Sequence, residues 1–389
     1  MRHTLSRLRI AVLIRHYTRI GGAERYCVEL TERLAEQHEV HLFCQAIEVE
    51  PHPNIIVHII PKKREKPRYL NQLEFSKLTR LATEGQFDIV HSHDMVTHAN
   101  VQTLHVPCVR SRYTEISGIR KILRYLNTAL SPRLLAYLWL EKKQICTNNN
   151  RQIIAVSEFL ARNIINSYPD IVNNINIAYP GIALVKSENT HSINRKQQRK
   201  ALGITDEGFV ILFVANDYKR KGLLVILEAI KVLANPRLHL VVAGDDRPEK
   251  FSAAVNKAGL NNQLHFIGKC EDMHALYPIA DALIHPTLAD TYAMVVLEAM
   301  AHAIPVIVSN ANYCGFSEHL TENEALLIEQ PKDPAELAKH INALLNDTEL
   351  RNCLAKNGRK KALALSWENT VKQTMLAYGK ALEPEPSTK

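Results

Sequence analysis

ALIHPTLADTYAMVVLEAMAHAIPVIVSN, residues 282–310, predicts a strand, a helix and a second strand in succession. The two ends, ALIHP (282–286) and PVIVSN (305–310), are short apolar runs typical of strands that are buried on both faces. The segment between them predicts a helix that starts near Thr291, which can cap it. This order of elements is the repeating unit of a parallel sheet covered by helices.

The same alternation continues along the whole chain. The expected strands are 8–15, 39–44, 54–60, 88–93, 100–106 and 152–157 in the first half, and 209–215, 238–244, 263–268, 282–286, 305–310 and 325–330 in the second. Residues 183–200 are polar, carry no sustained apolar period and are expected to be a linker. We therefore predict an α/β protein of two Rossmann-like domains, 1–182 and 201–365, with parallel sheets facing a central cleft. Residues 366–389 are expected to form a helix that packs back towards the N-terminal domain, followed by a polar tail.

Length and composition agree with two globular domains. The chain has 389 residues, of which 46% are hydrophobic and 23% are charged. The longest apolar run, Leu134 to Leu140, is far shorter than the roughly 20 residues that span a bilayer. The N-terminal apolar run ends at Arg15 and lacks the core of a signal peptide. The seven cysteines form no CxxC pair, which favours reduced thiols and a cytoplasmic location.

The net charge of +8 is unevenly distributed. Residues 1–200 carry 29 Lys and Arg against 17 Asp and Glu (+12), whereas residues 201–389 carry 19 against 23 (−4). The excess is densest from Arg110 to Lys143, where a basic amphipathic stretch starts at residue 118. Such a stretch can lie on anionic lipid, or it can be an ordinary surface helix with a basic face. The first half is thus expected to meet an anionic partner: nucleic acid, a phosphorylated acceptor or a membrane surface.

The arrangement of glycines and carboxylates argues against several classes of enzyme. No GxGxxG occurs, which disfavours a dinucleotide dehydrogenase. Gly203 and Gly208 have the spacing of a P-loop, but Phe209 follows them, which disfavours a nucleoside triphosphatase. No DxD triplet supports a metal site, since Asp245 and Asp246 are adjacent.

Two loops at strand ends are candidate anion sites. Gly21 and Gly22 lie between the first strand and a helix, where paired glycines let a ligand approach the backbone, or simply make a tight turn. Lys219, Arg220 and Lys221 precede a helix expected to begin at Leu223. Cations at a helix N-terminus oppose the helix dipole, so this loop is either a solvated basic turn or a phosphate site.

One carboxylate, Glu298, lies inside the apolar segment Met294 to Ala301. A buried carboxylate must be paired or must contact a ligand, because burying it alone costs several kcal/mol. A ribose diol would satisfy it. Asp290, eight residues earlier, is expected at the mouth of the same helix.

Taken together, these segments resemble the GT-B glycosyltransferases of glycosyltransferase family 4, in the branch that contains lipopolysaccharide core glucosyltransferases. The motifs that carry the resemblance are Gly21-Gly22-Ala23-Glu24, DIVHSH (88–93), AVSEFLAR (155–162), YPGI (179–182), RKG (220–222) and EAMAxxxPV (298–306). The resemblance implies transfer of a sugar from a nucleotide-sugar donor, with retention of anomeric configuration and without a metal ion or other cofactor.

The resemblance also implies residue roles. Glu298 would hold the ribose hydroxyls, and Arg220 with Lys221 would hold the diphosphate. The backbone amides around Ala293, Met294 and Val295 would contact the donor sugar and its phosphate. Gly21 and Gly22 would approach the diphosphate from the other domain.

Two positions depart from the family pattern and bear on donor choice. Asp290, against the sugar, replaces the usual glutamate, and Ala293 replaces the usual glycine. His105 could reach the donor sugar from the N-terminal domain, although a lone histidine at a strand end is more often structural. His93 is interpreted as structural.

The expected activity is transfer of a hexose or N-acetylhexosamine, with a UDP-sugar favoured, to a glycan or lipid-linked acceptor in cell-envelope polysaccharide or lipopolysaccharide synthesis. The expected location is cytoplasmic, with attachment to the inner face of an anionic membrane as an option. A sugar-nucleotide epimerase or phosphorylase on the same fold is an alternative, and a nucleic-acid-binding protein is a weaker one because no nucleic-acid motif is present.

Overall fold

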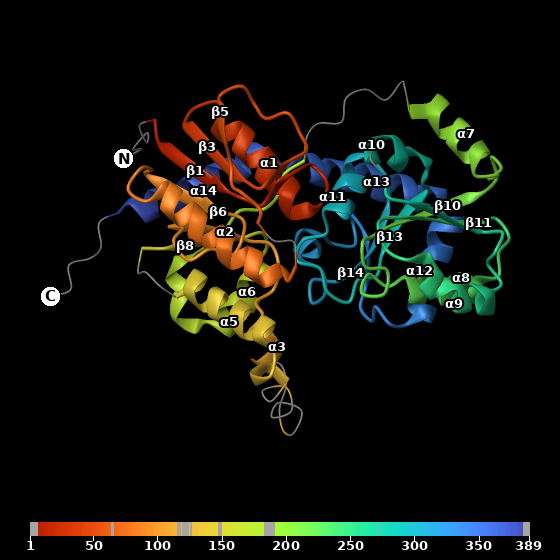
Figure 1. Ribbon diagram of the computed structural model, residues 1–389. Coiled ribbons are helices and arrows are strands. Elements are labelled where there is room, and N and C mark those ends of the chain that lie inside the picture. Colours follow the sequence, from red (N-terminus) through yellow and green to blue (C-terminus); the bar gives the residue numbers. More distant parts are fainter. Residues whose placement is uncertain are drawn as a thin grey trace. The chain divides into compact units, whose positions relative to one another are not determined.

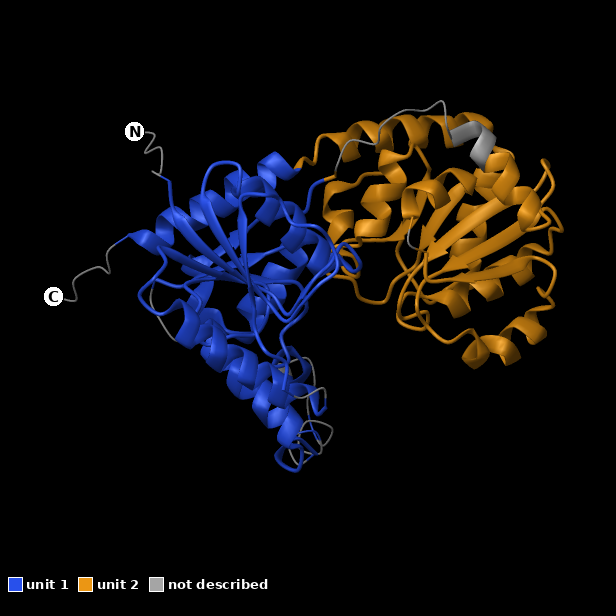
Figure 2. Cartoon of the chain, turned by 45° about the horizontal axis from the view of Figure 1, so that its top comes forward, with its two compact units in different colours: residues 1–181, 367–389 blue, residues 182–366 orange. Residues whose placement is uncertain are grey.

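A computed structural model describes residues 7–63, 66–114, 118, 124, 127–146, 150–182, 191–270 and 272–383. The chain divides into two compact units (Figure 2). Unit 1 is built from residues 1–181 and 367–389, and unit 2 from residues 182–366. The predicted α/β class with two parallel sheets is confirmed.

Unit 1 contains a seven-stranded sheet in the order β5-β3-β1-β6-β7-β8-β9, in which every strand pair is parallel (Figure 1). Its strands are β1 (Arg9–Leu13), β3 (Glu39–Cys44), β5 (Ile55–Ile59), β6 (Ile89–Ser92), β7 (Val101–Leu104), β8 (Gln152–Ala155) and β9 (Ile175–Ile177), with the short pair β2 (His16–Tyr17) and β4 (Ala46–Ile47) beside them. Its helices are α1 (Gly22–Leu34), α2 (Arg68–Thr83), α3 (Ser111–Thr114), α5 (Pro132–Ile145), α6 (Glu158–Ser167), η1 (Pro169–Asn174) and α14 (Trp367–Leu382).

Unit 2 contains a six-stranded parallel sheet in the order β12-β11-β10-β13-β14-β15. Its strands are β10 (Phe209–Val214), β11 (Leu238–Ala243), β12 (Leu264–Gly268), β13 (Ala282–His285), β14 (Val306–Ser309) and β15 (Leu326–Ile328). Its helices are α7 (His191–Ala201), α8 (Leu223–Leu233), η2 (Pro248–Phe251), α9 (Ser252–Ala258), α10 (Met273–Leu276), η3 (Tyr277–Ile279), α11 (Met294–Ala301), η4 (Gly315–His319), α12 (Pro334–Asn346) and α13 (Thr348–Leu363).

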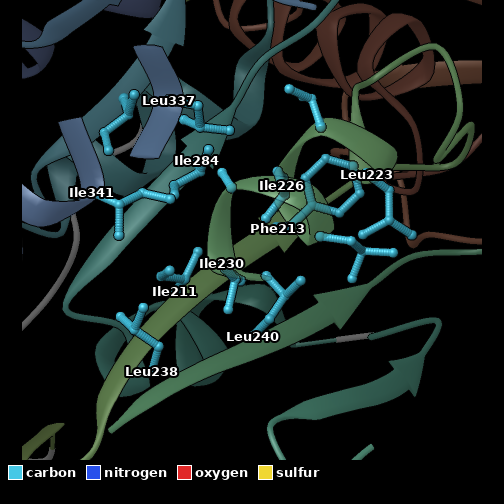
Figure 3. Packing of buried hydrophobic residues seen from close by; sticks show 14 of the residues in the cluster. Ile211, Phe213, Leu223, Ile226, Ile230, Leu238, Leu240, Ile284, Leu337 and Ile341 are labelled. Carbon is cyan, nitrogen blue, oxygen red and sulfur yellow. The ribbon is translucent and has the colours of Figure 1, made fainter. Parts of the chain in front are cut away.

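The core of unit 2 lies between its sheet and helices α8 and α12. Alternate residues of β10, Ile211 and Phe213, point to the same face and pack with Ile226 of α8 and Ile341 of α12 (Figure 3). All four side chains are at most 1% exposed. Strand β10 pairs with β13, and the loops that follow these two strands carry the candidate site.

Helix α14 follows unit 2 in the sequence but belongs to unit 1, where it packs against α1 and β8. Trp367 and Tyr378 are fully buried there. The Tyr378 hydroxyl lies 2.8 Å from Nδ1 of His91 on β6, so the helix is joined to the sheet by a buried polar contact as well as by packing.

The expected linker requires a correction. Residues 183–190 lie outside the described residues, but residues 191–201 form helix α7 of unit 2. Arg195 and Arg199, one turn apart, donate to the carboxylate of Asp281 and to backbone carbonyls of residues 278–280. Because polar contacts hold this helix, it has no sustained apolar period by which the sequence could reveal it.

The basic amphipathic stretch expected over residues 118–143 falls partly outside the described residues, which include 118, 124 and 127–143 of it. Helix α5 forms its second part. No helix within the described ranges is long and apolar enough to cross a membrane.

Candidate active site

The candidate site of unit 2 lies where two neighbouring parallel strands end. Carboxyl ends of adjacent parallel strands meet at one edge of a sheet, so the loop after β10 lies beside the loop after β13. The amide of Leu288 donates to the carbonyl of Arg220 over 2.9 Å and joins the two loops. The Lys221 ammonium donates to the carboxylate of Asp290 and lies 3.4 Å from the carbonyl of Ala289. The structure thus brings together two residues that are 69 positions apart in sequence.

Both carboxylate oxygens of Asp290 accept hydrogen bonds at this edge of the sheet. Its Oδ2 accepts from Lys221 and from Nε2 of His285 over 2.9 Å. Its Oδ1 accepts from the backbone amides of Tyr292 (3.3 Å) and Ala293 (3.1 Å). Burial opposes ionisation, but the Lys221 ammonium and the His285 hydrogen bond outweigh it and hold the pKa of Asp290 well below its usual range. Asp290 is therefore an ionised carboxylate with protein donors on both oxygens.

Helix α11 begins at Met294 and not near Thr291, so the predicted helix start is wrong. The Asp290 side chain binds the amides of Tyr292 and Ala293 in a loop conformation, and Ala293 has left-handed backbone angles (φ 64°, ψ 63°) that a helix does not allow. The amides of Met294 and Val295 then lie in the first turn, where helix amides lack intrahelical acceptors. Such a turn is a ready anion site.

The basic loop before α8 is partly neutralised by the chain itself. Lys221 is paired with Asp290, and the half-exposed Arg220 lies 3.2 Å from the carboxylate of Asp217. We expected these cations to destabilise the N-terminus of α8 unless an anion were bound. This expectation needs correction, because the carboxylates of Asp217 and Asp290 already offset two of the positive charges. Lys219 remains as an excess positive charge, and Lys219 and Arg220 are exposed.

Gly222 sets the closeness of the two loops. It has φ 91°, and a Cβ atom there would overlap the carbonyl of Pro286. Only glycine meets both conditions without strain.

Glu298 lies on α11, is 5% exposed and accepts a 2.6 Å hydrogen bond from the hydroxyl of Tyr277. The sequence predicts that this buried carboxylate has a partner, and Tyr277 is such a partner. The sequence did not identify it. Tyr277 follows α10, and nothing in its sequence context marks it.

His285 is the second site residue that sequence reasoning missed. It ends β13 and is 1% exposed. Burial lowers its pKa, and the opposing effect of Asp290 is smaller, so the ring is neutral. The signal available in the sequence was its place at a strand end, immediately before Pro286 and the Asp290 loop.

The remaining candidates lie in unit 1. Gly21 has φ 101° and is the N-cap of α1, and Gly22 is its first residue. The carboxylate of Glu24 folds back to the place where a Cβ of Gly21 would lie. Burial is the main cause that raises the pKa of Glu24. The helix dipole favours a carboxylate at this place, so the Glu24 side chain already occupies the anion-favouring end of α1.

His105 follows β7 and belongs to a stack of aromatic rings. Its Nε2 lies 3.1 Å from Nδ1 of His93, and the two rings stack at 5.3 Å between centroids. The Tyr26 ring meets it edge-on at 5.1 Å. Burial lowers the pKa of His105 to about 4, which keeps it neutral at physiological pH. No cluster of metal-ligating side chains occurs among the residues that the structure describes.

Comparison with known proteins identifies both halves of the chain. The family model of Glycosyltransferase Family 4 matches residues 20–186, and that of Glycosyl transferases group 1 matches residues 194–361. An uncharacterized glycosyltransferase of Methanocaldococcus jannaschii, MJ1607, is 26% identical over 94% of this chain and 95% of its own. A D-inositol 3-phosphate glycosyltransferase of Salinispora arenicola is 24% identical over 93% and 88%. Lipopolysaccharide glucosyltransferase WaaG of Escherichia coli is 30% identical over 43% and 46%.

Solved structures show the same fold. A crystal structure of WaaG, involved in lipopolysaccharide biosynthesis, matches with a TM-score of 0.80 and 21% identity over 94% of this chain and 99% of that one. Anabaena HepE in complex with UDP-glucose matches with a TM-score of 0.73 and 18% identity over 96% and 99%. The chain is a glycosyltransferase of the GT-B fold, with a family 4 domain followed by a group 1 domain.

Proposed function

We propose that this protein transfers a hexose or N-acetylhexosamine from a UDP-sugar to a glycan or lipid-linked acceptor, with retention of configuration. The observation that carries the proposal is the pairing, at one sheet edge of unit 2, of the cationic turn before α8 with the Asp290 loop that leads into α11. HepE, which shares the fold, has been solved with UDP-glucose. These two points support a UDP-sugar as the donor.

In the proposed reaction, the bond from the anomeric carbon to the diphosphate breaks and a bond to an acceptor hydroxyl oxygen forms. UDP leaves, and the acceptor hydroxyl gives up its proton. Negative charge develops on the departing diphosphate, and fixed cations and helix-end amides stabilise it without reorganisation. Arg220 and Lys221 supply the cations, and Met294 and Val295 supply the amides. This arrangement performs the task that a divalent metal performs in other transferases.

The other proposed roles are those that the resemblance to family 4 implies. Glu298 binds the ribose hydroxyls of the nucleotide, Asp290 and Ala293 line the sugar end, and the Gly21-Gly22 turn and His105 act from unit 1. Each role is tested by the effect of substitution on UDP and on the UDP-sugar separately.

The test begins with thermal unfolding of the full chain in EDTA with UDP-glucose, UDP-N-acetylglucosamine, GDP-mannose and the free nucleoside diphosphates. We expect UDP and one UDP-sugar to raise the melting temperature, and slow hydrolysis of that donor to release the α-anomer first, as followed by proton NMR. Stabilisation by GDP alone, a requirement for magnesium or manganese, or release of the β-anomer would contradict the proposal.

The acceptor is proposed to be membrane-linked, and the protein is proposed to act at the cytoplasmic face of an anionic membrane. On α5, Leu135 and Trp139 lie one turn apart and are about half exposed, at 47% and 52%, and Leu130 before the helix is 83% exposed. Lys142 and Lys143 follow on the same helix and are exposed. Apolar side chains beside lysines are typical of surfaces that lie on anionic lipid. WaaG, a relative by sequence and fold, is named a lipopolysaccharide glucosyltransferase.

Vesicle co-sedimentation tests this location. We expect binding to vesicles that contain anionic lipid, weaker binding at higher salt, and a loss of binding in the double variant Lys142→Gln/Lys143→Gln. The matched control is Lys231→Gln/Lys257→Gln in unit 2, which removes the same charge from α8 and α9. Equal binding to neutral and anionic vesicles would contradict attachment to an anionic membrane. Transfer of the sugar to a phosphorylated small molecule, and not to a lipid-linked glycan, would contradict a membrane-linked acceptor.

A further inference from the structure

None of the roles proposed above involves His285. It is buried at the end of β13, and its Nε2 lies 2.9 Å from the same Asp290 oxygen that accepts from Lys221. The imidazole and the ammonium therefore share one carboxylate oxygen. Through Asp290, His285 acts on the lysine proposed to meet the diphosphate.

The proton on His285 has one possible place. The ring is neutral because burial lowers its pKa, and Asp290 is ionised, so Asp290 can only accept. Nε2 therefore carries the hydrogen, and Nδ1 is a bare acceptor that has no hydrogen-bond partner within the part of the chain that the structure describes. The single N–H of the ring is committed to Asp290.

This hydrogen bond limits both the orientation and the charge of Asp290. Backbone amides hold Oδ1, while His285 and Lys221 hold Oδ2, so the carboxylate plane cannot rotate. Without the imidazole donor, Oδ2 would be left to the ammonium alone, and the carboxylate could follow the flexible lysine side chain. The tighter Lys221–Asp290 pair would then compete with a diphosphate for the same ammonium.

We propose that His285 is a positioning residue of the donor site, which holds the Asp290 carboxylate so that the Lys221 ammonium stays available to the diphosphate of the donor. The proposal rests on the proposed function. It assigns to Asp290 a role in orienting Lys221 through contacts that occupy both of its oxygens.

The test compares two variants that differ in the donor at the Nε2 position. The side-chain NH₂ of glutamine lies as many bonds from the backbone as Nε2 of histidine. Leucine has no hydrogen-bond donor and fills the site with an apolar side chain. Calorimetry with UDP and with uridine then isolates the diphosphate contribution as the ratio of the two affinities. We expect His285→Leu to lower this ratio about tenfold with uridine affinity unchanged, and His285→Gln to restore most of it.

A coupling experiment separates positioning from a structural role. In the Lys221→Met background the ammonium is absent, so His285→Leu should leave the UDP-to-uridine ratio unchanged. If His285→Leu does not fold, His285→Asn, which also lacks a donor at the Nε2 position, takes its place. Equal losses of UDP and uridine affinity, or the same loss with and without Lys221, would overturn the role of His285. Wild-type protein that binds UDP no better than uridine would instead overturn the donor site itself.

Discussion

Replacing Glu298 with glutamine is the perturbation that most sharply separates a ligand contact from a structural one. The glutamine carbonyl can still accept the hydrogen bond that the Tyr277 hydroxyl gives to Oε2 over 2.6 Å, so the buried contact is preserved. The negative charge and one acceptor oxygen are lost. The substitution therefore removes the charge that a ribose diol would use while it keeps the Tyr277 contact.

The magnitude follows from the burial of the site. Glu298 is only 5% exposed, so water cannot replace a hydrogen bond that its carboxylate loses. A charge-assisted hydrogen bond of this kind contributes roughly 1.5–3 kcal/mol. This corresponds to about 10- to 150-fold in affinity. Because the ribose is common to UDP and to the UDP-sugar, both ligands should weaken by the same factor.

The assay is calorimetry with UDP and UDP-glucose, together with thermal unfolding without ligand. Tyr277→Phe is the matched control, because it removes the donor to Glu298 but keeps the carboxylate. We expect this control to lower the melting temperature and to weaken UDP less than Glu298→Gln does. A Glu298→Gln protein that binds both ligands normally but unfolds at a lower temperature would refute the ribose role and leave Glu298 as a structural partner of Tyr277.

Three further outcomes follow from the geometry. Ala293→Gly should stabilise the protein by up to about 1 kcal/mol, since φ 64° strains alanine and not glycine; an unchanged or lower melting temperature would argue against strain at this position. Gly222→Ala should separate the two loops, because its Cβ overlaps the Pro286 carbonyl, and should abolish binding of UDP in calorimetry; retained affinity would show that the loops can move apart freely. Burial lowers the pKa of His91 to about 3, so the unfolded chain binds a proton below pH 6.5 that the folded chain does not, and stability should fall as pH falls from 6.5 towards 3. At pH 5 the share of His91 in this loss is about 2 kcal/mol, so in urea unfolding His91→Gln should lose about that much less stability than the wild-type protein between pH 7 and pH 5.

Much of the fold could be predicted because buried parallel strands are short apolar runs. All twelve expected strands occur, within two residues at their ends. Strand β9 was missed because INI (175–177) is too short to form a recognisable run. Helix α7 was missed because arginine contacts to carbonyls, and not an apolar face, hold it to unit 2.

The candidate site was predictable only in part. The sequence places Lys221 and Asp290 at the ends of strands, but their ion pair depends on β10 and β13 being neighbours, which periodicity does not reveal. The predicted start of α11 was wrong because the Asp290 side chain holds the amides of Tyr292 and Ala293 in a loop and Ala293 has left-handed backbone angles. Tyr277 carries no local signal, and His285 carries only its place at the end of a strand, since each matters through a carboxylate that the fold brings to it.

Arg220 and Lys221 are proposed to hold the diphosphate of a UDP-sugar without a metal ion. Calorimetry of UDP against uridine in EDTA tests this proposal, for the wild-type protein and for the variant Arg220→Met/Lys221→Met. We expect the wild-type protein to bind UDP more tightly than uridine in EDTA, and the double variant to lose this preference while it still binds uridine. Equal affinity of the wild-type protein for UDP and uridine, a preference that returns only with added magnesium, or a double variant that keeps the preference would contradict it.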